Sequence, residues 1–136
     1  MEKRKDVYSK EYIFKNGCIV DIMVWDTRQL FLDNSPHDGL ECYAFFHPYE
    51  YKAEQLQNGA LKPIYQKEVG EIHLVKGEYG SGVIAHECAH ACIQWLEMSG
   101  LNISANEESF CYELGMIVSK FWTWHYQILD ETIGMS

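Results

Sequence analysis

The amino-acid sequence predicts an α+β fold. Its residue pattern changes once, from strand-like alternation in the first half of the chain to helical periodicity in the second half. No internal repeat, low-complexity tract or Pro/Gly-rich linker divides the chain. A chain of 136 residues, 47% of them hydrophobic, can bury one core but is short for two independent folding units. We therefore expect residues 1–136 to form a single domain, with a small twisted N-terminal sheet followed by two long helices.

The first two strands are expected to form a hairpin. Residues 12–14 and 18–24 are rich in β-branched and aromatic side chains, and they flank Asn16 and Gly17. Asn and Gly tolerate the positive φ angles that tight hairpin turns require.

A loop and two further elements are expected before the middle of the chain. Residues 33–39 are a cluster of turn formers, and the strand-like run 41–46 follows them. A short helix over 51–58, closed by Asn58-Gly59, is a further prediction.

Residues 69–75 alternate well enough to predict a strand. Ile72 and Leu74 would lie on one face of this strand, and Glu71 and His73 on the other. The strand comes just before the first long helix.

The first long helix is expected from about Gly82 to Met98. Ser81 can cap its start, and Gly100 lies just beyond its end. The uncharged residues 83–85 and 91–92, with no proline among them, indicate a buried helix.

This helix carries His86-Glu87-Cys88-Ala89-His90, an HExxH motif. Because an α-helix has 3.6 residues per turn, His86 and His90 lie on one face, one turn apart, where two imidazoles can bind one zinc ion. Glu87 then lies beside the metal, where it can take a proton from a zinc-bound water. The motif predicts His86 and His90 as metal ligands and Glu87 as the catalytic residue.

The second long helix is expected to start at Ser104 or Asn106 and to run to about Ile128. Its core-facing residues recur at helical spacing. They are Phe110, Leu114, Ile117, Phe121 and Trp124.

A catalytic zinc site needs a third protein ligand and one open position. Glu107 and Glu108 begin the second helix, and an antiparallel helix pair would return them toward the first helix. Glu108 is favoured as the ligand because it shares a stripe with Gly115, which would let the two helices approach closely. Glu107 remains the alternative, and Glu113, a full turn deeper, is the third choice.

Residues 83–92 and 106–112 together resemble the gluzincins, zincin metallopeptidases in which a glutamate is the third zinc ligand. More narrowly, they are similar to the very small metallopeptidase-like domains of bacterial and phage genomes. The resemblance covers roughly residues 69–125, whereas residues 1–68 match no family pattern. It implies a zincin-like fold, with His86 and His90 as zinc ligands, Glu87 as general base, and Glu108 or Glu107 as third ligand. It also implies that the strand 69–75 forms the upper rim of the cleft and pairs with an extended peptide substrate.

Many enzymes of this kind stabilise the oxyanion with a His or Tyr, and this chain has no secure counterpart of that residue. The candidates are Tyr79, Tyr112, His125 and His73.

Charge and cysteine content narrow the partners and the compartment. The net charge of −9 argues against nucleic acid as a partner, since only residues 2–5 form a short basic run. That run lacks a following apolar h-region, and no apolar run reaches transmembrane length, so a cytoplasmic protein without membrane contact is expected. The five cysteines include no CxxC pair, which favours reduced thiols. Cys88 and Cys92 are interpreted as small buried hydrophobes, with a Cys-containing metal site as the alternative.

The sequence therefore predicts a zinc-dependent metallohydrolase, most simply a metallopeptidase that acts on a peptide or protein substrate. A catalytically weak or inactive zincin-like module, which binds zinc and acts through protein–protein interaction, is the alternative. A metal-free interaction domain with an accidental motif is the third hypothesis.

Overall fold

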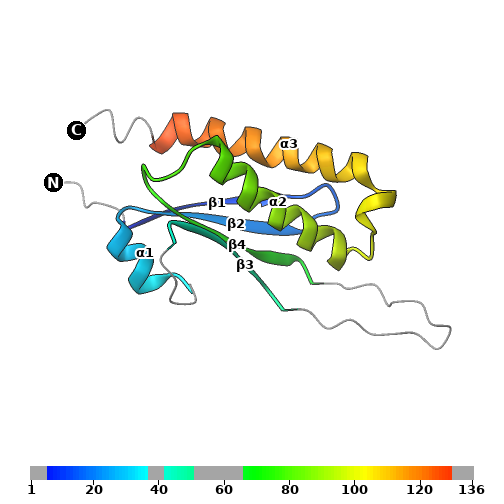
Figure 1. Cartoon of the computed structure of the whole chain (residues 1–136), viewed down its shortest axis with the longest axis horizontal. Coiled ribbons are helices and arrows are strands. Elements are labelled where there is room, and N and C mark those ends of the chain that lie inside the picture. Colours follow the sequence, from blue (N-terminus) through cyan, green and yellow to red (C-terminus); the bar gives the residue numbers. More distant parts are fainter. Residues whose placement is uncertain (1–5, 37–41, 51–65, 130–136) are drawn as a thin grey trace.

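Short strands, of which β2 (Ile19–Trp25) alternates buried and half-buried side chains, build a four-stranded sheet, and two long helices cover one of its faces (Figure 1). The structure is a computed structural model, and it describes residues 6–36, 42–50 and 66–129. The elements in chain order are β1 (Val7–Ile13), β2 (Ile19–Trp25), α1 (Arg28–Asn34), β3 (Ala44–Pro48), β4 (Glu68–Val75), α2 (Ser81–Met98), the 3₁₀ turn η1 (Ile103–Ala105), α3 (Glu107–Trp124) and the π-helical turn η2 (His125–Leu129). The predicted α+β class is confirmed.

The predicted hairpin is confirmed, and its first strand begins earlier than expected. β1 and β2 pair antiparallel from Val7↔Trp25 to Ile13↔Ile19. Gly17 has a φ of +91°, which explains why a glycine stands in the turn. Alternate residues of β2 are buried beneath the helices, so the hairpin forms part of the core.

The strand predicted over 69–75 is present as β4, but it lies inside the sheet. The strand order is β1-β2-β4-β3, with β4 parallel to β2 and antiparallel to β3. Both hydrogen-bonding edges of β4 are therefore occupied, and the prediction that this strand forms the cleft rim and pairs with substrate is wrong. Burial explains the difference, because β4 is covered on both faces, as central strands are. The edge strand next to α2 is β3.

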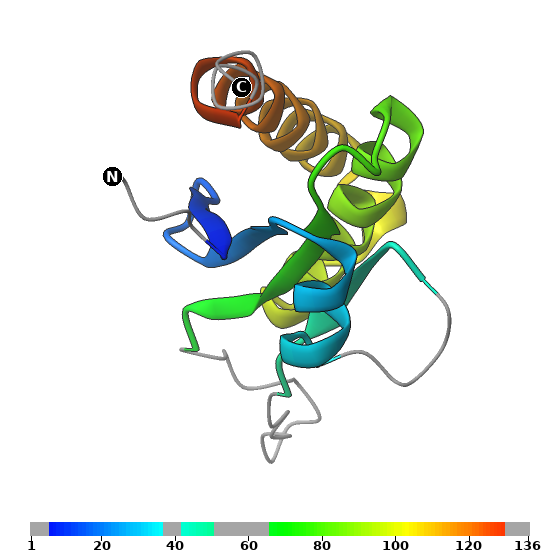
Figure 2. The ribbon, with the colours of Figure 1, turned by 90° about the vertical axis from the view of Figure 1, so that its left-hand side faces the viewer.

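Helix α1 was not predicted. Its seven residues are too few to show a clear period, although Thr27 caps the helix by accepting a hydrogen bond from the Leu30 N–H. Figures 1 and 2 show α1 on the face of the sheet opposite to α2 and α3. Phe31 of α1 is fully buried there and contacts Phe45 edge-to-face, with ring centroids 5.7 Å apart. The predicted helix at 51–58 and part of the predicted loop at 33–39 lie outside the described residues.

Helices α2 and α3 confirm the two predicted helices, and each differs in detail from its prediction. Gly80 rather than Ser81 occupies the N-cap of α2, and Gly100 follows its end with a φ of +71°. Helix α3 starts after Asn106, and its last turn changes to the π-helical turn η2. No helix in the described part of the chain is long and apolar enough to cross a membrane.

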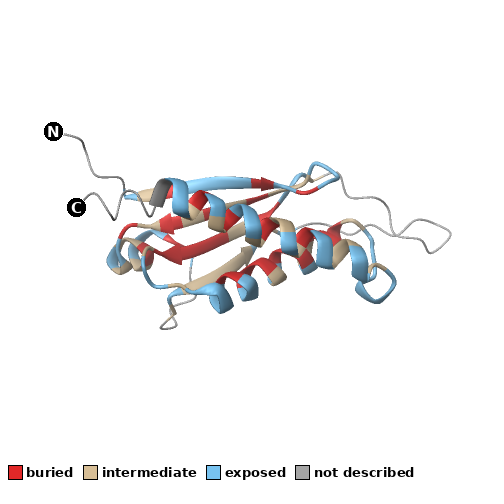
Figure 3. Ribbon diagram, turned by 90° about the horizontal axis from the view of Figure 1, so that it is seen from above, coloured by how far each residue is buried: buried red, intermediate tan, exposed pale blue. Residues whose placement is uncertain are grey.

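The main core lies between the sheet and the two long helices (Figure 3). Ile117, Phe121 and Trp124 of the predicted stripe are buried, and Phe110 and Leu114 pack against them half-buried, which confirms the stripe. This packing fixes which face of α2 remains outside the core.

Candidate metal centre

The HExxH motif lies near the middle of α2, with both histidines at the surface. The side chain of His86 is 68% exposed, and His90 is also exposed. Their Nε2 atoms are 3.1 Å apart, and their rings are nearly perpendicular. Two nitrogens that each bind a tetrahedral zinc ion at ~2.0–2.1 Å are separated by roughly 3.3–3.4 Å. The pair is therefore arranged much as two ligands of one ion would be.

Glu87 differs from the two histidines because it is buried. It is 6% exposed, and its Oε1 lies 3.8 Å from Nε2 of His86. Its Oε2 is the one buried side-chain nitrogen or oxygen, among the described residues, that has no hydrogen-bond partner. Burial raises the pKa of this carboxyl, and the neighbouring His86 and His90 partly offset the rise. An unpartnered buried carboxylate oxygen costs about 1–3 kcal/mol, and a polar ligand in the cleft would remove that cost.

These three residues fit a zinc ion by their donor atoms and by their spacing. One ligand atom from each of His86, Glu87 and His90 lies within 4.8 Å of the others. Imidazole nitrogen and carboxylate oxygen are ordinary zinc ligands. No other group of three His, Cys, Asp or Glu side chains in the described part of the chain meets the same criterion.

The structure does not bring Glu108 or Glu107 to this group. Both are exposed in the first turn of α3, which adjoins the C-terminal end of α2 (Figure 1). The histidines lie near the middle of α2, and His90 is eight residues before its last residue, Met98. Tyr112, four residues after Glu108 on the same side of α3, is 59% exposed, and a Cβ on Gly115 would meet no atom within 4 Å, so the close approach of α2 that favoured Glu108 is not observed at this side of α3. Solvent, rather than α2, faces this side of α3.

Glu113, the third choice as ligand, has other partners. It is 1% exposed and accepts hydrogen bonds from the Tyr12 hydroxyl and from the Lys15 backbone N–H. Its carboxylate faces the hairpin rather than the HExxH face of α2.

The four residues that were candidates for stabilising the oxyanion either lie away from His86 and His90 or form hydrogen bonds with other residues. Tyr79 and His125 are hydrogen-bonded to each other at 2.9 Å. His73 lies on the α1 side of the sheet between Trp25 and Glu71, and Tyr112 points to solvent on α3. The sequence pattern did not reveal Tyr43, which lines a pocket together with His86 and Glu87. Its only sequence signal is its place within the strand-like run 41–46.

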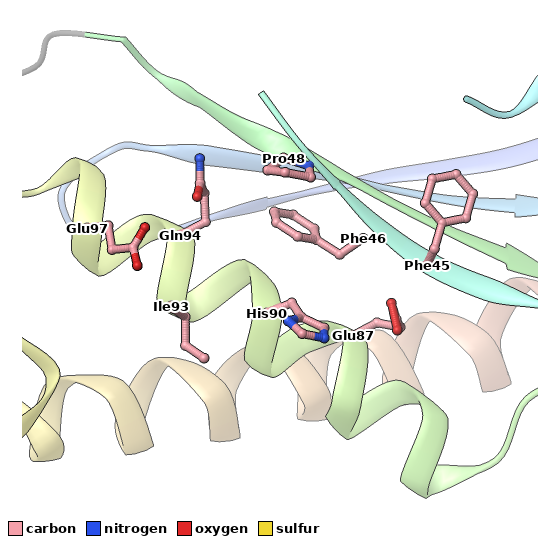
Figure 4. Close-up of a pocket in the computed structure, with 8 residues that line it drawn as sticks. All are labelled: Phe45, Phe46, Pro48, Glu87, His90, Ile93, Gln94 and Glu97. Carbon is pink, nitrogen blue, oxygen red and sulfur yellow. The ribbon is translucent and has the colours of Figure 1, made fainter. Parts of the chain in front are cut away.

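Two pockets flank the candidate metal centre in the groove between α2 and β3, and Glu87 lines both of them. The His86-side pocket, about 510 Å³, is lined by Tyr43, Ala44, Gly82, Val83, His86 and Glu87. The His90-side pocket, about 450 Å³, is lined by Phe45, Phe46, Pro48, Glu87, His90, Ile93, Gln94 and Glu97. Figure 4 shows Glu87 and His90 turned from α2 toward Phe46 and Pro48 of β3.

Cys88 and Cys92 lie on the opposite side of α2, in the core. Burial raises the pKa of each thiol to about 12, and Glu87 adds to the rise at Cys88. Neither belongs to the metal-binding group, so the interpretation of both as small buried hydrophobes agrees with their place in the core.

Comparison with protein-family models, with curated proteins and with solved structures finds no match to this chain. The resemblance to the gluzincins rests on the motif residues alone.

Proposed function

We propose that this protein is a zinc-dependent metallohydrolase that cleaves peptide bonds, with His86 and His90 as zinc ligands and Glu87 as the general base. No described residue other than Glu87 joins the two histidines as a third ligand. The observation that carries the proposal is the relation between these side chains. The buried carboxylate of Glu87 has one oxygen, Oε2, without a hydrogen-bond partner, and its other oxygen lies 3.8 Å from Nε2 of His86, which is 3.1 Å from Nε2 of His90. A structural role alone gives no reason to bury Glu87 without a hydrogen bond, since unpartnered buried polar atoms are rare and costly.

A zinc ion bound here would lower the pKa of a water molecule to about 7 and polarise a substrate carbonyl. Glu87 accepts the proton that the attacking water loses as the new C–O bond forms. It then returns this proton to the leaving nitrogen as the C–N bond breaks. The buried position of Glu87 keeps its carboxylate directed at the reacting atoms instead of at solvent.

The outer edge of β3, with which no described strand pairs, supports a peptide as the substrate. The Tyr49 N–H donates to the Val69 carbonyl at 3.1 Å, and Phe45 and His47 pair with β4 in the same register. Because hydrogen-bonded and non-hydrogen-bonded positions alternate in an antiparallel pair, the N–H and C=O groups of Ala44 and Phe46 face outward. Extended peptides bind such edges by adding a strand, and this edge borders the groove that holds Glu87.

The experiment compares the wild-type protein with the Glu87→Gln variant. Zinc content is measured by atomic emission, and hydrolysis is measured on a mixture of peptides by mass spectrometry. Glu87→Gln is expected to keep its zinc and to lose about 10²–10⁴-fold in kcat. The matched control is Glu11→Gln on the far edge strand β1, which removes the same charge from an exposed position. Equal turnover by wild type and Glu87→Gln would overturn the role of Glu87.

A second candidate function is a zinc-binding module that acts through protein–protein contact. The exposure of both histidines favours it, since an exposed pair is accessible to a donor from another chain. Stoichiometric zinc, no cleavage of any peptide in the mixture, and a zinc-dependent complex with a second protein would together identify this function.

A further inference from the structure

One stripe of α2 faces the groove, and its chemistry changes along its length. Val83, His86, His90, Ile93 and Glu97 recur at spacings of three and four residues, so they lie on one side of the helix. The stripe begins with an apolar side chain, continues through the two histidines, and ends with a carboxylate. The two ends of the groove therefore offer different surroundings to a bound chain.

The His86-side pocket suits an apolar side chain. Apart from His86 and Glu87, its lining consists of Tyr43, Ala44, Gly82 and Val83. Tyr43 and Val83 are 49% and 36% exposed, which is a large exposed fraction for apolar side chains beside a polar site. The Arg28 guanidinium lies 3.9 Å from the Tyr43 ring centroid and donates to the Cys42 carbonyl at 3.1 Å. This positive charge disfavours a basic side chain at the same end.

The His90-side pocket suits a basic side chain. Phe46, Pro48 and Ile93 supply apolar walls for the methylene stem of a lysine or arginine, and Glu97 supplies a carboxylate at the far end (Figure 4). Gln94, the other polar residue at that end, donates its amide hydrogen to the Tyr49 carbonyl at 3.1 Å. Among the described residues that line this pocket, Glu97 therefore brings the only charge to the end away from the candidate metal centre.

A peptide bound along the edge strand β3 would meet the two pockets in a fixed order from its N-terminus to its C-terminus. Ala44, at the start of β3, lines the His86-side pocket, and Pro48, at its end, lines the His90-side pocket. A peptide that pairs antiparallel with β3, the slightly more stable arrangement, has its N-terminal part beside Pro48 and its C-terminal part beside Ala44. Glu97 lies seven residues beyond His90, about 10 Å along the helix axis, which is the length of about three extended residues.

We propose that the groove selects peptides with a basic side chain about three residues before the cleaved bond and an apolar side chain directly after it. This selectivity rests on the proposed hydrolase function. Glu97 binds the basic side chain of the peptide, and Tyr43 and Val83 contact its apolar side chain. The net charge of −9 adds a general attraction for basic peptides, so the position of the basic residue, and not only its presence, is the specific part.

The test measures peptide binding, so that it does not depend on turnover. Zinc-loaded Glu87→Gln protein is titrated into fluorescein-labelled decapeptides, and anisotropy is recorded in 50 mM salt. One peptide has Arg three residues before a central Gly-Leu bond, a second has Gln there, a third has Glu, and a fourth has the first sequence in reverse order. We expect the Arg peptide to bind about 5–10-fold more tightly than the Gln peptide, and more tightly than the reversed peptide.

Charge reversal at Glu97 separates a specific contact from general attraction. In the Glu97→Lys variant the Glu peptide is expected to bind better than the Arg peptide, whereas the matched control Glu11→Lys, which changes the net charge by the same amount, should keep the preference for the Arg peptide over the Glu peptide. Glu97 is exposed on α2, and circular dichroism verifies that the variant folds. Glu97→Gln supplies a second variant, in which the preference for Arg over Gln should disappear.

Equal binding of the Arg and Gln peptides, or an Arg preference that survives Glu97→Lys, would overturn the basic-residue selectivity. Equal binding of the forward and reversed peptides would overturn the assigned order. Failure of the proposed hydrolase function would give a different result. Wild-type protein would then cleave none of the peptides, whereas the anisotropy measurement would still show whether the Arg peptide binds more tightly than the Gln peptide.

Discussion

The Tyr12 hydroxyl donates a hydrogen bond to the carboxylate of Glu113, which lies 101 positions later in the chain. The same carboxylate accepts the Lys15 backbone N–H at 3.0 Å, just beyond the end of β1. These two hydrogen bonds of Glu113 thus link the first hairpin of the sheet to the middle of α3. Burial, together with the bond to Glu113, raises the pKa of Tyr12, so its hydroxyl stays protonated as the donor.

Removing either partner of this contact is expected to destabilise the fold. Glu113→Ala leaves the buried Tyr12 hydroxyl and the Lys15 N–H without their acceptor, which should cost about 2–4 kcal/mol of unfolding free energy. Tyr12→Phe should cost about 1–3 kcal/mol, because it leaves one carboxylate oxygen without that donor. Urea unfolding of the two single variants and the double variant measures their coupling. Purely additive effects would show that the two side chains do not interact in solution.

A second prediction concerns stability against pH, and it rests on His73. This residue is 2% exposed, its Nδ1 accepts from the Trp25 indole N–H at 3.0 Å, and its Nε2 lies 2.7 Å from a Glu71 oxygen. Burial lowers the pKa of His73, although Glu71 opposes the shift. The unfolded chain therefore takes up a proton at about pH 6.5, before the folded chain does. Stability is complete above that pH and falls as the pH decreases through the lower folded pKa.

Urea unfolding between pH 8 and pH 5 measures this decline. His73→Phe should lower the unfolding free energy at pH 8 by about 1–3 kcal/mol, since it removes two buried hydrogen bonds, and should flatten the dependence below pH 6.5. His47→Gln, on the neighbouring strand, is the control and should keep the decline. An unchanged slope in His73→Phe would assign the pH dependence to other groups.

The sequence predicted those parts of the fold that depend on local patterns. The hairpin turn at Gly17, the strand at Ile72 and Leu74 and the ends of α2 follow from turn chemistry, period and capping, all of which are read within a few residues. The insertion of β4 between β2 and β3 was not predictable in this way, because strand order depends on contacts between distant segments.

The same distinction explains the candidate site. His86, Glu87 and His90 share one helical turn, so their proximity follows from helix geometry alone. The choice of Glu108 required knowing how α3 is rotated against α2, and the exposure of Tyr112 on its stripe shows that the rotation differs from the expected one. Tyr43 reaches the site only because β3 is the edge strand beside α2.

Gly70 is expected to tolerate no side chain, because it lies directly opposite Pro48 at the end of β3 in the antiparallel pairing of β3 with β4. A Cβ at this position would lie 2.5 Å from the His47 carbonyl oxygen and 2.8 Å from the Phe46 ring. Gly70→Ala should therefore lower the unfolding free energy by about 2 kcal/mol or more, and should displace the strand that borders the groove. Gly115→Ala is the matched control, since its Cβ would meet no atom within 4 Å in an exposed helix, and it should stabilise by about 0.5–1 kcal/mol. Equal effects of the two substitutions in urea unfolding would contradict this packing.

The third ligand can be tested by zinc affinity. Glu108 and Glu107 were expected from the sequence, yet both lie outside the group formed by His86, Glu87 and His90. As the chain is folded here, Glu108→Gln and Glu107→Gln should each leave the zinc dissociation constant within about twofold of wild type. A loss of tenfold or more in either variant, about 1.4 kcal/mol, would instead identify that glutamate as a ligand. Competition with a fluorescent zinc chelator measures the constants.

Zinc itself is expected to stabilise the protein through His86 and His90. A ligand that binds only the folded state adds about 2.7 kcal/mol at a free concentration of 100 times its dissociation constant. For a chain of 136 residues this corresponds to a rise of roughly 10 °C in Tm. Differential scanning fluorimetry with and without zinc should show this rise in Tm for the wild-type protein. His86→Ala and His90→Ala should each abolish the rise, because each removes one of the two imidazole nitrogens that lie 3.1 Å apart. His125→Ala is the control for the loss of any histidine, because His125 is hydrogen-bonded to Tyr79 and not to His86 or His90. This variant should keep the full zinc-dependent rise in Tm.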